Sequence, residues 1–227
     1  SISVSGFFES TNRSQPVISE IIFENGTHWA AADIFEQLDT SSEGDDQLYG
    51  DAGNNFIEGL AGDDRLFGNE GNDIIEGGGG NDTIEGNAGN DILSGGSGSD
   101  QLKGGTGDDT YLVNIGDGQS HVSQRTSAIT DNDVIEFCAG ITPDDVTFTI
   151  DGSNYTSLLV YYNGGDYWSG DSIRVYDFWS GHGSLTTLSD SSIDTLQFQD
   201  GTVWTTDYIQ SNIFTPTERS NFISLGD

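Results

Sequence analysis

Eight aspartate or asparagine side chains recur at nine-residue intervals between residues 41 and 112, and regularly spaced side-chain oxygens can bind a hard cation. A glycine stands two residues before each of them, and a large apolar residue stands two residues after. The phrase reads G-G-x-G-x-D-x-U-x, where U is the apolar residue, and its cleanest copies are residues 77–85 and 104–112. This period predicts a calcium-binding repeat. The oxygen-bearing residues are Asp46, Asn55, Asp64, Asp73, Asp82, Asp91, Asp100 and Asp109.

Each column of the repeat has a physical cause. A glycine at the fourth position permits a positive φ, so a tight turn can direct its carbonyl groups inward. The apolar residue at the eighth position is expected on a very short strand, pointing into the interior. Two turns make one coil of 18 residues, so alternate copies stack. We call Asp46, Asp64, Asp82 and Asp100 stack one, and Asn55, Asp73, Asp91 and Asp109 stack two.

Electrostatics predicts that these stacks need a cation. Neighbouring turns lie about 4.8 Å apart, and two carboxylates at about 5 Å repel by roughly 3 kcal/mol at an effective dielectric near 20. A divalent ion between turns reverses that sign. The gaps between turns predict about six calcium ions. A disordered linker would have no reason to keep an apolar residue at every ninth position, so that alternative is disfavoured.

Residues 41–112 resemble the RTX family, with its haemolysin-type calcium-binding repeats. The resemblance implies that the sixth-position side chains and the carbonyls of the glycine-rich turns hold calcium. Asn55 carries no charge and the first copy lacks its leading glycines, so weaker sites are expected there. The implied glycine ligands are Gly44, Gly53, Gly59, Gly62, Gly68, Gly71, Gly77, Gly80, Gly86, Gly89, Gly95 and Gly98.

The sequence after the repeats changes character. Alternating apolar residues predict four strands and a final helix-like stretch, in a region that resembles the capping domain of many RTX blocks. Asp133 stands in a decayed repeat and is predicted to bind one more calcium. The predicted strands are 146–150, 158–162, 173–178 and 193–198, and the predicted helix is 206–213.

The two ends of the chain also resemble each other. Residues 1–8 resemble 172–179, and residues 22–29 resemble 197–204, at offsets of 171 and 175. Asn25-Gly26 and Asp200-Gly201 are predicted hairpin turns, and 31–38 is a predicted helix. We expect one period of a tandem RTX protein. Its predicted parts are 1–40, the tail of a preceding cap; 41–136, the roll; 137–213, the cap; and 214–227, a linker toward another block.

The composition excludes several classes of partner. The 227 residues carry a formal charge of −32, which disfavours nucleic acid and anionic membranes and favours cations. No apolar run reaches the ~20 residues of a membrane span. The single cysteine excludes a disulfide framework. No secretory signal peptide opens the chain, and the resemblance implies a bacterial, extracellular protein exported by a type I secretion machinery.

Catalytic motifs are missing from the sequence. His28, His121 and His182 are scattered, and neither a G-x-S-x-G elbow nor an H-E-x-x-H motif occurs, so we predict no enzyme activity. The third repeat column lacks the regular threonine that ice binding would need. Aromatic residues between Tyr161 and Trp179 are more often the core of a cap than a platform for sugars.

The sequence therefore predicts an all-β fold, a right-handed parallel β-roll flanked by β-rich capping segments. The predicted function is a calcium-binding structural module that folds on meeting extracellular calcium after type I export, with a toxin or adhesin as parent. Neighbouring RTX blocks are predicted partners. Two alternatives stay open: the calcium-dependent tail of a secreted hydrolase or epimerase, and a module that binds surface glycans.

Overall fold

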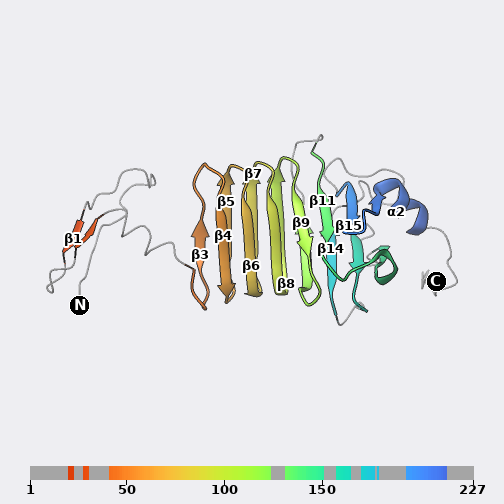
Figure 1. Ribbon diagram of the computed structural model, residues 1–227, viewed down its shortest axis with the longest axis horizontal. Coiled ribbons are helices and arrows are strands. Elements are labelled where there is room, and N and C mark those ends of the chain that lie inside the picture. The colour runs from red at the N-terminus through yellow and green to blue at the C-terminus, as the bar shows by residue number, and fades with distance from the viewer. Residues whose placement is uncertain are drawn as a thin grey trace, which may run out of the picture. The chain divides into compact units, whose positions relative to one another are not determined.

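The structure is a computed structural model, and it divides into two compact units, residues 1–40 and residues 41–227. It describes residues 20–22, 28–30, 41–123, 131–150, 157–164, 170–176, 178 and 193–213. The described part of the second unit is mostly β-strand and consists of a roll followed by a cap (Figure 1). No helix among the described residues is long and apolar enough to cross a membrane.

The roll is built from seven parallel strands that wind in coils. One sheet takes strands β3, β5 and β7 and the second half of β8, while the other takes β4, β6, the first half of β8, and β9. Every pair joins residues 18 apart, as Leu66 with Ile84 and Ile75 with Leu93, which confirms the predicted coil. The strands are β3 Gln47–Tyr49, β4 Phe56–Ala61, β5 Arg65–Glu70, β6 Ile74–Gly80, β7 Thr83–Ala88, β8 Ile92–Thr106 and β9 Thr110–Val113.

The interior of the roll is the column of eighth-position apolar side chains. Four residues of this column, Leu66, Ile75, Ile84 and Leu93, are 0 % exposed. Leu48 and Ile57 in the first coil are each 7 % exposed. The difference follows from position, because the first coil has a neighbouring coil on one side only among the described residues. Each coil therefore buries two apolar side chains and depends on stacking to exclude water from them.

The turns of the roll need backbone conformations that favour glycine. Gly62, Gly80 and Gly98, all at the fourth position, have φ of 120°, 136° and 142°. A Cβ on Gly80 would also collide with the carbonyl group of Gly62, one coil earlier. Fourth-position glycines therefore stack directly on one another, which explains why this column is invariant along the chain.

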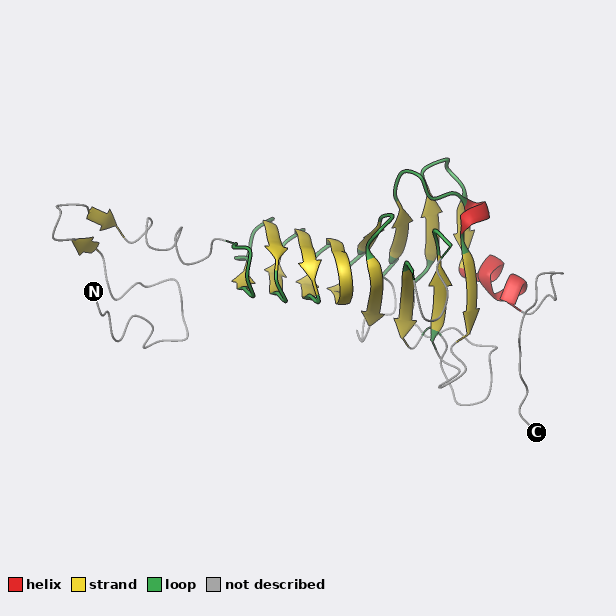
Figure 2. Cartoon of the chain, turned by 90° about the horizontal axis from the view of Figure 1, so that it is seen from below, coloured by secondary structure: helices red, strands yellow, loops and turns green. Residues whose placement is uncertain are grey.

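Both parallel sheets of the roll continue directly into the cap. Strands β10 (Gly118–Ser123) and β14 (Ser172–Tyr176) continue one parallel sheet, and β11 (Val134–Phe137) and β15 (Thr195–Phe198) continue the other. Antiparallel strands then close both edges, and Figure 2 shows the helix α2 covering the end. These closing elements are the 3₁₀ turn Pro143–Asp145, β12 Thr147–Ile150, β13 Leu158–Tyr161, β16 Val203–Thr205 and α2 Thr206–Ile213.

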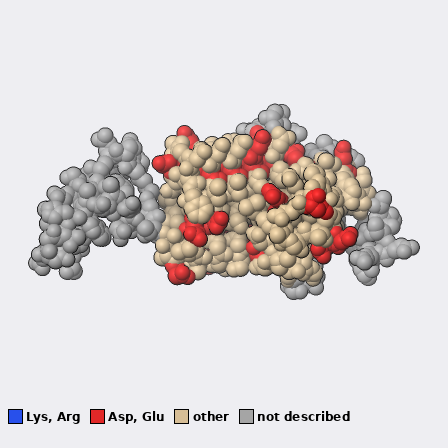
Figure 3. Space-filling model, in the orientation of Figure 1, with Lys and Arg blue, Asp and Glu red and all other residues tan. Residues whose placement is uncertain are grey.

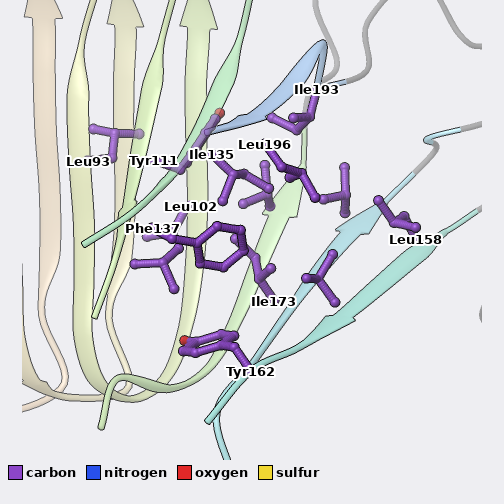
Figure 4. Close-up of a cluster of buried hydrophobic side chains, with 14 of the residues drawn as sticks. Leu93, Leu102, Tyr111, Ile135, Phe137, Leu158, Tyr162, Ile173, Ile193 and Leu196 are labelled. Carbon is purple, nitrogen blue, oxygen red and sulfur yellow. The ribbon is translucent and has the colours of Figure 1, made fainter. Parts of the chain in front are cut away.

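The core also runs from roll to cap without interruption. Tyr111 and Ile135 lie beside Phe137, which stacks on Phe198 with ring centroids 4.9 Å apart (Figure 4). Trp204 packs edge-on against Phe198 at 4.9 Å. The aromatic residues of the cap thus replace the aliphatic column of the roll, and they give the solenoid a sealed end.

The elements predicted for the cap agree with the structure to within two residues. Helix α2 spans the predicted 206–213, and strands β12, β13 and β15 begin or end one or two residues inside their predicted ranges. Strand β14 begins one residue earlier than predicted. The Asp200-Gly201 turn joins β15 to β16, with φ of 89° at Gly201. The Asn25-Gly26 turn and the helix predicted at 31–38 lie outside the described residues.

The first unit contains an antiparallel hairpin of β1 (Glu20–Ile22) and β2 (His28–Ala30). Its pairs Glu20–Ala30, Ile21–Trp29 and Ile22–His28 each have a counterpart 175 residues later in the β15–β16 hairpin. The sequence similarity between the two ends thus extends to strand register.

Candidate calcium sites

A ladder of hydrogen bonds joins the aspartates of each stack. In stack one, the backbone N–H of Asp64 donates to Oδ1 of Asp82 at 2.9 Å, and that of Asp82 donates to Asp100 at 3.0 Å. In stack two, the N–H of Asp73 donates to Oδ1 of Asp91 at 2.8 Å. One oxygen of each carboxylate is therefore fixed by the coil before it, which orients the whole side chain.

The second carboxylate oxygen has no partner among the described residues. Oδ2 is buried without a hydrogen bond in Asp64, Asp73, Asp82, Asp91, Asp100 and Asp109, and these residues are at most 1 % exposed. An isolated buried anionic oxygen is strongly unfavourable unless it meets a cation or a donor. Six such atoms in register indicate a repeated site for a positively charged ligand.

Glycine and a main-chain carbonyl complete the surroundings of Oδ2 in the inner coils, at Asp64, Asp73, Asp82 and Asp91. A Cβ built on Gly86 would lie 2.7 Å from the carbonyl oxygen of Gly104 and closer still to Asp91 Oδ2. A Cβ on Gly59, Gly68 or Gly77 would meet the equivalent pair of oxygens. Because the first-position residue is glycine, this space between coils is lined by oxygen and is not filled by a side chain. Oxygen-only surroundings fit calcium.

Burial makes these carboxylates difficult to ionise without a ligand. It raises the pKa of Asp64, Asp73, Asp82 and Asp91, and it raises the pKa of Asp100 and Asp109 to about 7. Repulsion from neighbouring aspartates raises most of these pKa values further, as Asp82 does for Asp100. A bound cation would favour the ionised form and remove both penalties.

The first coil differs from the others. Oδ2 of Asp46 accepts hydrogen bonds from the N–H of Ser42 at 2.6 Å and from its hydroxyl at 2.9 Å. Oδ1 of Asn55 accepts the N–H of Asp51 at 3.0 Å. Serine and aspartate replace glycines at these second positions, and they occupy the oxygens that are free in later coils. The weaker first sites stay a prediction.

The predicted glycines fall into two groups. First-position glycines (Gly59, Gly68, Gly77, Gly86 and Gly95) lie against the aspartate Oδ2 atoms. Fourth-position glycines stack at the adjoining turn, where Gly62, Gly71 and Gly89 donate to carbonyl groups of the next coil at 2.8–2.9 Å. The other predicted fourth-position glycines are Gly44, Gly53, Gly80 and Gly98, and a Cβ on Gly80 or Gly98 would meet the fourth-position glycine one coil earlier.

A second ladder was missed by the sequence analysis. Fifth-position side chains accept the N–H of the equivalent residue in the following coil, as Asn54 does from Asn72 at 2.9 Å and Asn72 from Asn90 at 2.9 Å. The sequence feature that could have predicted this ladder is a wholly polar column. The ladder runs in the opposite direction to the aspartate ladder. The column reads Asp45, Asn54, Asp63, Asn72, Asn81, Asn90, Ser99 and Asp108.

The acidic side chains of the roll have few basic side chains beside them that would compete with a cation. On the face shown in Figure 3, they form a row across the roll, and no lysine or arginine of the described residues is visible. No three His, Cys, Asp or Glu side chains of the described residues gather as a metal cluster. A cation bound in this part of the roll would therefore need main-chain carbonyl oxygens as well as carboxylates.

The other candidate residues play structural parts where they are described. His121 packs against Tyr176 with ring centroids 5.9 Å apart, and burial lowers its pKa, as does Arg174. Tyr162 and Phe178 are buried in the core of the cap. The side chains of His28, His182, Tyr167, Trp168 and Trp179 lie outside the described residues, so the glycan alternative stays a prediction.

Fold and site together define a class: a parallel β-roll with calcium-binding repeats and a β-rich cap. Residues 40–75 and 76–111 match the RTX calcium-binding nonapeptide repeat, and residues 158–208 match the haemolysin-type calcium binding protein related domain. The chain belongs to the RTX family of haemolysin-type calcium-binding repeat proteins.

Two solved structures are similar at low identity. The solution structure of the AlgE6R3 subunit of the Azotobacter vinelandii mannuronan C5-epimerase is 19% identical, with 71% of this chain and 82% of that chain covered and a TM-score of 0.38. The crystal structure of the extracellular lipase LipA from Serratia marcescens is 18% identical, with 67% and 38% covered and a TM-score of 0.27. No curated protein sequence matches the chain significantly.

Proposed function

We propose that this chain is a structural module of a secreted protein that folds when extracellular calcium fills the gaps between its coils. The observation that carries the proposal is two rows of three buried Oδ2 atoms, one row in each stack, each atom without a partner among the described residues. Ionised carboxylates in such rows form a stable arrangement only with cations in place.

The chain's own residues divide the work of binding. Aspartate N–H groups fix Oδ1 of the next aspartate, so Oδ2 is held toward the gap in the folded roll. First-position glycines keep the gap open and contribute carbonyl oxygens from the following coil. The bound calcium supplies positive charge that offsets the repulsion between successive turns. Asp64, Asp73, Asp82 and Asp91 would hold it in the inner coils.

Calcium then decides whether the roll exists. Extracellular calcium modules bind with Kd of about 10⁻⁴ M, and calcium at about 100 times Kd adds about 2.7 kcal/mol per site. About six sites would add about 16 kcal/mol. That exceeds the net stability of a typical domain, roughly 5–15 kcal/mol. Without calcium, the formal charge of −32 expands the chain.

This behaviour suits a protein exported unfolded. A compartment poor in calcium would keep the chain open for a type I secretion machinery, and extracellular calcium would then fold it outside a bacterial cell. The parent would be a toxin or adhesin in which this module is structural. The shared register of β1–β2 and β15–β16 supports a tandem protein, in which the first hairpin closes a preceding roll.

A calcium titration tests the proposal. Circular dichroism should show a cooperative coil-to-strand transition with calcium and little response to magnesium, because magnesium demands strict octahedral geometry. Replacing both Asp82 and Asp91 with Asn should raise the calcium midpoint about tenfold or more, since the hydrogen bonds survive but the charge is lost.

The matched control is Asp63→Asn. Asp63 lies on the exposed fifth-position ladder, where an amide oxygen can replace its Oδ1 as acceptor for Asn81. This variant should keep the wild-type midpoint. A chelator-treated protein that retains the full strand spectrum would contradict the proposal.

A further inference from the structure

The aspartate ladder of stack two does not end with the repeats. The N–H of Asp109 donates to Oδ1 of Asp133 at 2.9 Å, and the N–H of Asp133 donates to Oδ2 of Asp194 at 3.0 Å. These bonds have the same donor and acceptor groups as the ladder inside the roll. They extend the line of carboxylates through β11 and into β15 of the cap.

Strand register supports the continuation. Tyr111, Ile135 and Leu196 stand two residues after the three aspartates, align with one another across β9, β11 and β15, and are each 0 % exposed. Figure 4 shows these side chains directed into the common core. Asp194-Thr195-Leu196 therefore repeats the D-x-U part of the nonapeptide 85 residues after Asp109, outside the repeat block.

Stack one ends differently. The position after Asp100 in the ladder is Ser120, and the next is Ile173, which is fully buried. An apolar side chain cannot bind a cation, so the ladder of stack one does not continue in this register. The carboxylates at this junction are the buried Asp117 and Asp171, and Asp171 accepts the N–H groups of Gly116 at 2.8 Å and Gly118 at 3.2 Å.

The junction also holds an atom that calls for a ligand. Oδ2 of Asp109 is fully buried and has no hydrogen bond among the described residues, and a Cβ on Gly104 would collide with it. Asp133 lies one layer beyond and is 5 % exposed. Asp131 Oδ2 accepts the N–H of Gly107 at 3.2 Å, and so a further carboxylate flanks this gap.

We propose that calcium binds between Asp109 and Asp133, and that Asp194 carries this site into the cap, so that the ion fastens the cap to the roll. The carbonyl oxygen of Asp194 accepts the N–H of Thr206 at 3.2 Å, which links the ladder to the first residue of α2. This inference rests on the proposed function. It adds a site in which calcium controls closure of the solenoid end.

Hydrogen exchange on the full chain, read by mass spectrometry during a calcium titration, tests this inference. Asp133→Asn and Asp194→Asn keep the shape of the side chain and remove its charge. Each should raise the calcium midpoint for protection of residues 195–213 about tenfold, with little change for residues 56–93. Glu136→Gln is the control, because Glu136 lies on β11 beside buried Ile135 and Phe137 and faces outward.

The outcomes separate the two proposals. Repeats that stay unprotected at every calcium concentration would overturn the proposed function. Repeats that respond normally, while both variants protect the cap at the Glu136→Gln midpoint, would overturn the junction site alone.

Terbium luminescence gives a second readout if Asp133→Asn fails to fold. The Tyr111 hydroxyl accepts the N–H of Gly104 at 2.8 Å, and a Cβ on Gly104 would collide with Asp109 Oδ2, so Tyr111 lies close enough to sensitise an ion bound there. Signal should fall in Tyr111→Phe and in Asp194→Asn. An unchanged signal in both variants would contradict an ion at the junction.

Discussion

At the scale of single residues, the second repeat position also takes a positive φ from the third copy onward. Gly78, Gly96 and Gly105 have φ of 103°, 83° and 120°, and asparagine, which tolerates this region, takes the position in two further copies. Leu60 stands there with φ of 79°. A leucine in the left-handed region is strained, so this coil forms at a cost that the other coils avoid.

Leu60→Gly should therefore stabilise the calcium-loaded protein. Relief of the left-handed strain is partly offset by the greater freedom of glycine in the unfolded chain, which leaves a gain of about 0.5–1 kcal/mol. Denaturant unfolding in saturating calcium measures it. Leu60→Ala is the matched control, because it shortens the side chain but keeps the Cβ, and it should give no gain. Equal stability of the two variants would show that strain is not the cause.

At the scale of elements, the turns of the roll accept fewer substitutions than its strands do. Gly80 has φ of 136°, and its Cβ would collide with the Gly62 carbonyl. A Cβ on adjacent Gly79 would make only ordinary contacts, with Ser97 Oγ at 3.4 Å and the Leu60 carbonyl oxygen at 4.0 Å. The two neighbouring glycines thus differ sharply in whether a Cβ can be added to them.

Gly80→Ala should destabilise the roll by about 3 kcal/mol or more, since the coils must separate as well as strain the turn. Gly79→Ala should change stability by less than about 0.5 kcal/mol. The calcium midpoint by circular dichroism and the denaturation midpoint both report the difference. Similar losses in the two variants would be evidence against stacked fourth-position turns.

The sequence predicted the elements that repeat or alternate, and it missed those that depend on register between distant segments. The nonapeptide period predicted the coil and its interior column, and alternation located β12, β13 and β15. Asp194 escaped notice because its role depends on pairing β15 with β11, residues about 60 positions apart. The polar fifth column was visible in the sequence, but the direction of its hydrogen bonds depends on the geometry of the stacked turns.

At the scale of the whole molecule, protons and calcium compete for the same oxygens. Burial first, and repulsion between aspartates second, raise the pKa of Asp100, Asp109 and Asp133 from 3.8 to about 7. A group whose pKa is raised on folding stabilises the fold fully below its unfolded pKa. That stability is lost as pH rises through the folded pKa. The calcium-free roll should thus be most stable below about pH 4 and should lose stability as the pH rises from about 4 to 7.

Acidification should partly replace calcium as the folding trigger. Chelator-treated protein should gain strand content and contract when pH falls from 8 to 5, as measured by circular dichroism and small-angle scattering. With calcium present the direction reverses, because ligand carboxylates must lose their protons, so the calcium midpoint should rise on the same change of pH. If the calcium-free and calcium-bound proteins respond to pH in opposite directions, protons and calcium bind the same oxygens. A calcium-free chain as expanded at pH 5 as at pH 8 would mean that the buried carboxylates are not what holds the coils apart.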